Sequence, residues 1–261
     1  MEYICGFSKK VRENYMKKKN VGVIGNGKWA KVMIPKIAKY ANIKFIANTK
    51  TGYKKFRLDN LSWIFVLTNI ETHYEIVKYF LKKNKNVFCE KPLTKDYSTT
   101  EKLFQLSKKQ KVRLYVNNVE IFKKKNFLIN KNNFIIRSKN SKPTNESLLY
   151  RLAYHDFYLL EKYINLNYID IKKYKESKNK LNIIFYSNRK RFKFFYDINS
   201  IDKKHKINKT NMMKYVNDPI EKMIKFFLNN QNNFFFKNQI QSTFSIKLIS
   251  CLKENINKKH L

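Results

Sequence analysis

Cysteine, glycine, proline and arginine are all scarce in this sequence of 261 residues, and each shortage narrows the range of folds and functions. The three cysteines, Cys5, Cys89 and Cys251, lie far apart, which excludes a zinc-ligand spacing and a disulfide framework, so no metal site is expected. No apolar run approaches the ~20 residues that a membrane-spanning helix needs. The first residues also lack the unbroken apolar stretch of a signal peptide. We therefore expect a soluble, cytoplasmic protein that does not contact a membrane.

The formal charge of +37 raises the question of nucleic-acid binding, because clustered basic residues neutralise phosphates. Only seven of the 56 basic residues are arginines, and the lysines are spread over nearly every segment. Arginine is the preferred side chain for bidentate contacts with phosphate and guanine. Lys, Asn, Ile, Phe and Tyr are abundant throughout, which is typical of codons biased toward A and T. The charge therefore predicts weak, sequence-independent nucleic-acid binding and no specific nucleic-acid partner.

The N-terminal half alternates strand-like and helical patterns. This alternation predicts a parallel sheet with right-handed crossovers, and hence a Rossmann-type domain over residues 21–117. A lead-in segment, residues 1–20, precedes it, and Met16 is an alternative start. The expected strands are residues 21–24, 43–47, 63–68, 87–89 and 113–116, and the expected helices are residues 29–38, 74–83 and 98–109.

The pattern changes near Asn117. A polar stretch around one apolar patch, residues 134–136, precedes a helix expected over residues 154–164. Four strand-like segments separated by polar turns then predict an antiparallel meander. These segments are residues 169–174, 181–186, 192–198 and 205–207, and the helices expected after them are residues 218–228 and 243–252. Residues 118–261 are thus predicted to form a second α/β domain, whose final helix is a candidate to pack back on the first.

Glycines gather where the first strand meets the first helix. The motif Gly25-x-Gly27-x-x-Ala30 follows the strand directly, and Gly22 lies just before it. A dinucleotide's pyrophosphate needs close approach of the backbone and unpaired N–H groups at a helix N-terminus, which such a turn supplies. The motif predicts binding of NAD or NADP. A glycine turn without a ligand is the alternative.

Four segments resemble the Gfo/Idh/MocA oxidoreductases: residues 20–37, residues 63–94, residues 152–160 and the helix that begins at Asp218-Pro219. The turn Thr68 to His73 and above all the turn Glu90-Lys91-Pro92 carry the resemblance. It implies a Rossmann domain followed by an α/β domain with an open, mostly antiparallel sheet, which carries the substrate site and an interface for a homo-oligomer. It also implies hydride transfer between nicotinamide and a carbinol or carbonyl of a sugar, polyol or nucleotide sugar. The short stretch between Ala47 and Trp63 indicates that one Rossmann helix is trimmed or absent.

The resemblance also implies roles for single residues. Lys91 is expected to hold the substrate oxygen, and His155 to exchange the hydroxyl proton. A buried histidine with a structural hydrogen bond is the alternative for His155. For His73, a structural contact or a contact on the nicotinamide side is a better interpretation than a chemical role. The residues expected at the cofactor are Gly25, Asn26, Gly27, Lys28, Trp29, Asn48, Thr49, Thr68, Asn69, His73 and Glu90.

The end of the second strand determines the choice between NAD and NADP. An acid there would bond the ribose 2′-hydroxyl of NAD and repel a 2′-phosphate. This chain has Asn48, Thr49 and Lys50 at that point, and no acid before Asp59. The sequence therefore favours NADP.

One position departs from the family pattern. Relatives commonly carry an aspartate four residues before the matched histidine, where this chain has Arg151. A guanidinium cannot accept a hydrogen bond from the imidazole and disfavours its protonation. Two hypotheses follow. In the first, catalysis is impaired and the protein mainly binds a dinucleotide, unless Asp156 or Glu120 substitutes for the missing carboxylate. In the second, Arg151 binds an acidic sugar-like substrate.

Overall fold

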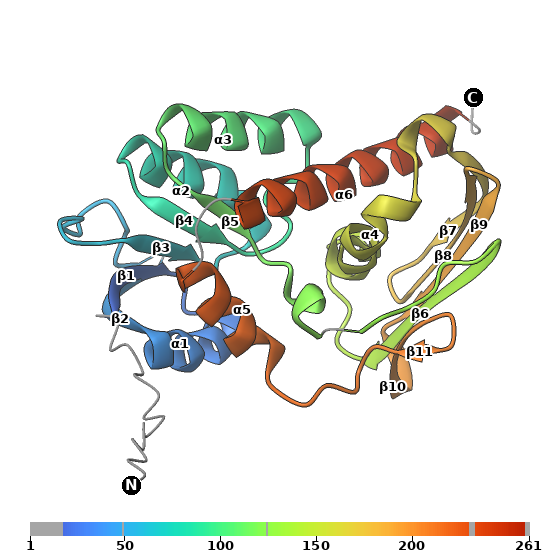
Figure 1. The fold of residues 1–261 in the computed structure, drawn as a ribbon, viewed down its shortest axis with the longest axis horizontal. Helices are drawn as coiled ribbons and strands as arrows, with labels where there is room; N and C mark the ends of the chain where they lie inside the picture. Colours follow the sequence, from blue (N-terminus) through green and yellow to red (C-terminus); the bar gives the residue numbers. More distant parts are fainter. Residues whose placement is uncertain (1–17, 49, 124, 230–232, 259–261) are drawn as a thin grey trace, which may run out of the picture.

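A five-stranded parallel sheet forms the N-terminal half of the computed structural model, which describes residues 18–48, 50–123, 125–229 and 233–258 (Figure 1). Its strand order is β2-β1-β3-β4-β5. The strands are β1 (Lys19–Ile24), β2 (Ala41–Ala47), β3 (Trp63–Val66), β4 (Asn86–Cys89) and β5 (Leu114–Val116). All four residues of β3 are buried, as a parallel sheet covered on both faces requires.

Helices cover both faces of this sheet. One face packs against α1 (Lys28–Tyr40) and α5 (Pro219–Asn229), the other against α2 (Ile70–Lys82) and α3 (Tyr97–Lys109). Between β2 and β3 the described residues form only turns and bends. The prediction that one Rossmann helix is missing is therefore confirmed.

The second sheet is mixed and mostly antiparallel, with the order β11-β10-β6-β9-β8-β7. It confirms the predicted fold class but corrects the meander, because β10 pairs with β6 and not with β9, and β6 runs parallel to β9. The unforeseen central strand is the polar stretch around residues 134–136, in which Asn133 and Ser138 are buried beside Ile135. The strands are β6 (Asn132–Asn140), β7 (Asp170–Glu176), β8 (Lys180–Ser187), β9 (Lys190–Asp197), β10 (Asn199–Ile207) and β11 (Thr210–Asn211).

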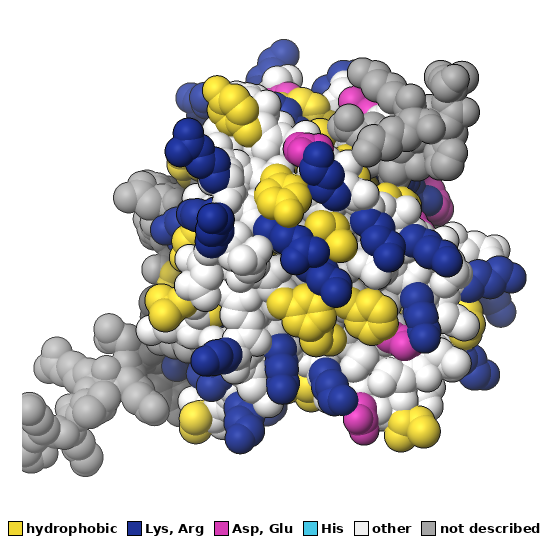
Figure 2. Space-filling model, turned by 90° about the vertical axis from the view of Figure 1, so that its right-hand side faces the viewer, with side chains coloured by type: hydrophobic (Ala, Val, Ile, Leu, Met, Phe, Trp, Pro, Cys, Tyr) yellow, Lys and Arg dark blue, Asp and Glu magenta, His cyan; other side chains and the backbone are white. Residues whose placement is uncertain are grey.

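One face of the second sheet is covered by α4 (Tyr154–Leu160), which continues a π-helical turn (Leu149–Ala153). The opposite face is open, and Figure 2 shows basic side chains scattered among apolar ones across it. Phe134 and Tyr186 are 38% and 37% exposed, and the Lys193 ammonium lies 5.2 Å from the centre of the Phe134 ring.

The last helix, α6 (Asn233–Lys258), begins ten residues before the predicted start at Thr243. The early start places Phe234 and Phe235 against Tyr115 and Trp63 of the first sheet. Further along, α6 contacts α3 and α4, so it bridges the two halves (Figure 1). Within the described residues, no helix is long and apolar enough to cross a membrane.

Candidate functional site

The two glycines that follow β1 lack a side chain for different structural reasons. Gly25 has φ +116°, and a Cβ there would lie 2.6 Å from the Leu67 carbonyl oxygen, so the fold itself requires glycine. Gly27 has an ordinary φ of −68°, and a Cβ there would meet nothing within 4 Å. The space in front of Gly27 is therefore open to a ligand.

Gly27 is also the N-cap residue of α1. No side chain caps this end, and the first turn holds no acidic residue. The first N–H groups of a helix lack partners within the helix, and the helix dipole adds partial positive charge. This end of α1 is suited to a phosphate group.

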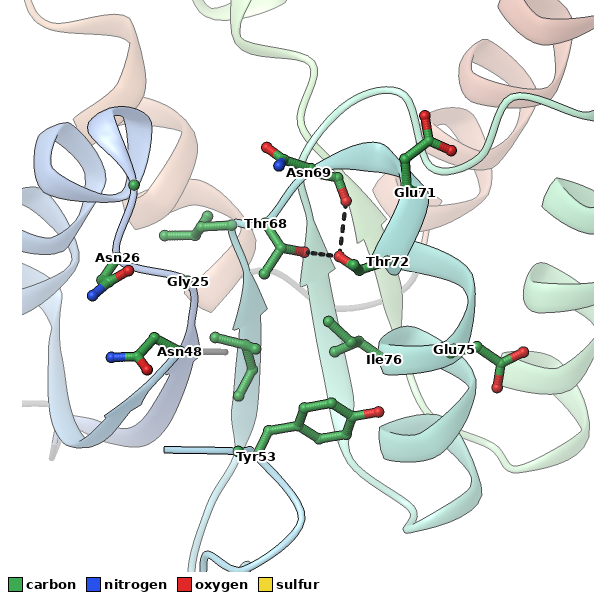
Figure 3. A pocket seen from close by; sticks show the side chains of 14 residues that line it. Gly25, Asn26, Asn48, Tyr53, Thr68, Asn69, Glu71, Thr72, Glu75 and Ile76 are labelled. Carbon is green, nitrogen blue, oxygen red and sulfur yellow. Dashed lines mark hydrogen bonds between the residues drawn. The ribbon is translucent and has the colours of Figure 1, made fainter. Parts of the chain in front are cut away.

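A cavity of about 590 Å³ opens beside this turn, at the carboxyl ends of β1 and β3. Ligand pockets typically measure ~300–1,000 Å³. Figure 3 shows Asn26 and Asn48 on one side of it, with Thr68 and Thr72, joined by a hydrogen bond, on another. The predicted cofactor residues that line it are Gly25, Asn26, Gly27, Asn48, Thr68 and Asn69.

Sequence reasoning missed part of this lining. Gly52 and Tyr53 come from the loop that replaces the absent helix, and such a loop gives no periodic signal. Glu71 and Thr72 lie in the first turn of α2, and Glu75 lies one turn further on. Residues one helical turn apart share a face, so the Thr68 to His73 motif could have indicated them.

Asn48 lies at the end of β2, as predicted, but its side chain is partly occupied by the fold. Its Oδ1 accepts hydrogen bonds from the backbone N–H groups of Lys50 (2.8 Å) and Thr51 (3.0 Å). Thr49 lies outside the described residues. Asn48 therefore shapes the loop as well as lining the cavity.

Four other predicted residues lie outside the cavity lining. Lys28 is exposed at the start of α1, and Trp29 beside it donates its indole N–H to Glu90. Burial raises the pKa of Glu90, although hydrogen bonds from Asn117 (2.7 Å) and Trp29 oppose the rise.

His73 joins two turns. Its Nε2 lies 3.0 Å from the Thr68 carbonyl oxygen and its Nδ1 lies 2.9 Å from that of Pro92. Burial lowers the pKa of His73, against the effect of these carbonyls. Both ring nitrogens of His73 therefore contact backbone carbonyls, and the residue does not line the cavity.

Lys91 reaches from the end of β4 to the π-helical turn of the second half. Its Nζ donates to the backbone oxygens of Tyr150 and Arg151, each at 3.1 Å. Burial is the main cause that lowers the pKa of Lys91. An ammonium has three donors, and within the described residues these two bonds use two of them.

His155 lies on α4, with Nδ1 3.4 Å from the Tyr158 hydroxyl. Burial, together with the charges of Lys91 and Arg137, holds the pKa of His155 well below its usual value. Lys91 and His155, far apart in sequence, are thus brought close enough to interact electrostatically.

Neither carboxylate considered as a substitute for the missing aspartate bonds His155. Asp156 accepts hydrogen bonds from Arg137 (3.0 and 3.3 Å) and from Tyr196 (3.0 Å), and lies 2.7 Å from His205 Nε2. Burial alone would raise the pKa of Asp156, but Arg137 and His205 outweigh it and hold that pKa far below the usual range. Glu120 pairs with Lys123 and Arg137. No motif indicated that Arg137 and His205 would join these two carboxylates in a buried cluster.

Arg151 is held by the loop after β6. One guanidinium nitrogen donates to Ser141 Oγ and to the Lys142 carbonyl, both at 3.0 Å. With His155, Arg151 lines a second cavity of about 160 Å³. The described residues contain no group of three or more metal-ligating side chains that could hold an ion.

Comparison with known proteins agrees with this geometry. The model of an oxidoreductase family with an NAD-binding Rossmann fold, Gfo/Idh/MocA, matches residues 35–118. The family resemblance predicted from the sequence is confirmed, and the chain has the fold of nicotinamide-dependent oxidoreductases. No curated protein matches the chain.

Two solved structures share the whole fold at low identity. The UDP-N-acetylglucosamine 3-dehydrogenase GnnA from Acidithiobacillus ferrooxidans is 13% identical, with a TM-score of 0.71, over 90% of this chain and 95% of its own. KijD10, a 3-ketoreductase from Actinomadura kijaniata in complex with NADP and TDP-benzene, is 12% identical, with a TM-score of 0.66, over 88% of this chain and 96% of its own. At this identity the likeness concerns the fold.

Proposed function

We propose that this protein is an NAD(P)-dependent oxidoreductase that transfers a hydride between nicotinamide and a carbinol or carbonyl carbon of a sugar, polyol or nucleotide sugar. The observation that carries the proposal is Gly27, whose missing side chain leaves open space before the uncapped end of α1, beside a cavity of about 590 Å³. The 3-dehydrogenase and the 3-ketoreductase of the same fold support the reaction class.

The residues present fit a dinucleotide. Backbone N–H groups after Gly27 would hold the pyrophosphate, and the side chains of Asn48 and Thr68 would face the rest of the cofactor. When bound, the nicotinamide supplies the acceptor or donor of the hydride.

Lys91 and His155 would act on the substrate. The remaining donor of Lys91 would hold the substrate oxygen and stabilise negative charge on it. Because the pKa of His155 lies well below neutrality, its imidazole would be neutral and able to accept the hydroxyl proton. On this proposal Arg151 would bind an acidic group of the substrate, and the open face of the second sheet would join copies of the chain.

We propose NADP as the preferred cofactor. NAD-specific sites carry an acid at the end of the second strand, whereas here no acid follows Asn48 in the sequence before Asp59; the two glutamates that line the cavity, Glu71 and Glu75, come from α2. Isothermal titration with each oxidised cofactor tests this preference. Clearly tighter binding of NAD would contradict it.

The central experiment has two stages. Binding of NAD(H) and NADP(H) is measured first, and formation of the reduced cofactor is then followed with neutral sugars, uronic acids and nucleotide sugars. Dinucleotide binding with turnover of at least one class is the expected result. A folded protein that binds no dinucleotide would overturn the proposal.

A second candidate is a dinucleotide-binding protein with impaired catalysis. It is favoured by one observation, that within the described residues His155 forms no hydrogen bond with a carboxylate. The family resemblance also implies an aspartate at the position of Arg151. Cofactor binding without turnover of any sugar class would support this second function.

A further inference from the structure

The second cavity, between β6, β10 and the start of α4, has an unusual charge. Its lining has six basic side chains and, within the described residues, no acidic one. The basic residues are Lys123, Arg137, Lys139, Arg151, Lys203 and Lys204.

Three of these six cations are already neutralised. Arg137 pairs with Asp156 and Glu120, Lys123 with Glu120, and Lys204 with Asp202. These pairs are part of the fold and leave no positive charge to spare for a ligand.

The other three, Lys139, Arg151 and Lys203, form no ion pair with a carboxylate in the part of the chain that the structure describes. Arg151 is oriented by Ser141 and a carbonyl oxygen, neither of which cancels its charge. Burial, and repulsion by Arg151, Lys91, Arg137 and Lys203, lower the pKa of Lys139 to about 8. Uncompensated like charges around a partly buried lysine are costly unless an anion joins them.

The size of the cavity limits what this anion can be. Its volume of about 160 Å³ lies below the ~300–1,000 Å³ of sites that enclose a whole small-molecule ligand. It holds a phosphate group and a few further atoms, and a whole nucleotide would extend beyond it. Three cations match a doubly charged phosphate better than a singly charged carboxylate.

We propose that this cavity binds a phosphate group of the substrate through Lys139, Arg151 and Lys203, which places the phosphorylated end of the substrate beside His155. The assignment of that molecule as the substrate rests on the proposed oxidoreductase function, but phosphate binding itself does not. Either a sugar phosphate or a nucleoside diphosphate sugar would supply the group.

The test compares a cavity variant with a matched surface variant. Lys139→Gln/Lys203→Gln removes two cavity cations. Lys193→Gln/Lys206→Gln removes two lysines of β9 and β10 that do not line the cavity. Each protein is titrated, without cofactor, with inorganic phosphate, a hexose 6-phosphate, a nucleoside diphosphate hexose, a hexuronic acid and a neutral hexose. Circular dichroism and thermal melting establish that the variants fold.

We expect the cavity variant to bind its phosphate ligand at least tenfold more weakly and the surface variant to change less than twofold. The hexose phosphate or the nucleoside diphosphate hexose that binds more tightly identifies the source of the phosphate. Equal losses in both variants, or tighter binding of the uronic acid, would overturn the proposal.

Proton uptake gives a second measurement. At pH 8 a phosphate monoester is already doubly charged, whereas Lys139 is only partly protonated. An anion beside Lys139 raises its pKa, so titrations in two buffers of different ionisation enthalpy should show proton uptake that Lys139→Gln removes. Phosphate binding by a protein that turns over no sugar would leave this inference standing while the proposed function fails.

Discussion

The two cavities differ in the groups that they offer to the anion proposed for each. The cavity beside Gly27 has no lysine or arginine among the described residues that line it, although the chain contains 56 basic residues. The cavity beside His155 has six. The first relies on backbone N–H groups at the start of α1, and the second on side chains.

This difference shows where lysine enrichment matters. Backbone donors are the same for every residue type, so the first cavity is insensitive to the composition of the chain. The second cavity depends on the side chain at each position, because its positive charge comes from lysine and arginine side chains. Substitutions should therefore affect the two cavities separately.

The largest effect is expected from Lys91→Met, which removes the group proposed to stabilise charge on the substrate oxygen. Turnover should fall about 10³-fold, the range typical of a lost general acid or oxyanion donor. Binding of dinucleotide should change less than twofold, because Lys91 does not line the first cavity. Lys102→Met, on an exposed lysine of α3 that lines neither cavity, is the control. A Lys91→Met protein with at least a tenth of the normal turnover would exclude this role.

The next effect separates the two glycines. Gly27→Val adds a side chain into open space, so dinucleotide affinity should fall about 100-fold with little change in stability. Gly25→Ala should instead lower the free energy of unfolding by about 1–3 kcal/mol, because of its positive φ and the contact with Leu67. Calorimetric binding and urea unfolding measure the two quantities. Unchanged affinity in a folded Gly27→Val protein would contradict the proposed cofactor site.

A smaller effect is expected from Arg151→Ala. kcat/KM for acidic sugars should fall about tenfold to a hundredfold, the range for one lost charge-assisted contact, and neutral sugars should be little affected. Arg151→Lys should recover only part of the activity, because it keeps the charge without the planar fork. If acidic sugars are turned over normally by Arg151→Ala, Arg151 does not bind the substrate's anion.

The smallest effect within the usual buffer range concerns pH. Because the pKa of Lys91 is lowered, its ammonium loses a proton as the pH rises to a value below the usual lysine pKa of 10.5. Above that pH, kcat/KM should fall about tenfold per pH unit. The pKa of His155 is also lowered, so the proposed base stays unprotonated down to well below pH 6.5 and activity should be flat through neutrality. A loss of activity near pH 6.5 that His155→Gln abolishes would show that His155 titrates normally.

The sequence predicted the first half of the molecule better than the second. Strands buried on both faces leave continuous apolar runs such as Trp63–Val66, and the glycine turn has a direct backbone cause. By contrast, β6 was missed because its buried positions include Asn133 and Ser138. These side chains are held by hydrogen bonds to backbone carbonyls and not by apolar packing. Its parallel pairing with β9 joins segments distant in sequence, which no local pattern encodes.

Only part of the candidate site could be predicted from the sequence. Motifs indicated Lys91, His155 and six residues that line the first cavity. The partners of Asp156 were out of reach, because Arg137 and His205 come from two different strands that only the fold brings together. Tyr53 was missed because it lies in an irregular loop.

The helix α6 has a consequence for the growing chain. β5 is the last strand of its sheet, and Asn238 of α6 covers its outer side, accepting from the Val116 N–H and donating to the Val116 carbonyl, both at 2.8 Å. Exposed strand edges are templates for pairing with other chains. During synthesis this edge stays uncovered until residue 238 has left the ribosome. A nascent chain, or one cleaved before α6, therefore exposes a strand edge that can pair with other chains and that α6 covers in the folded protein.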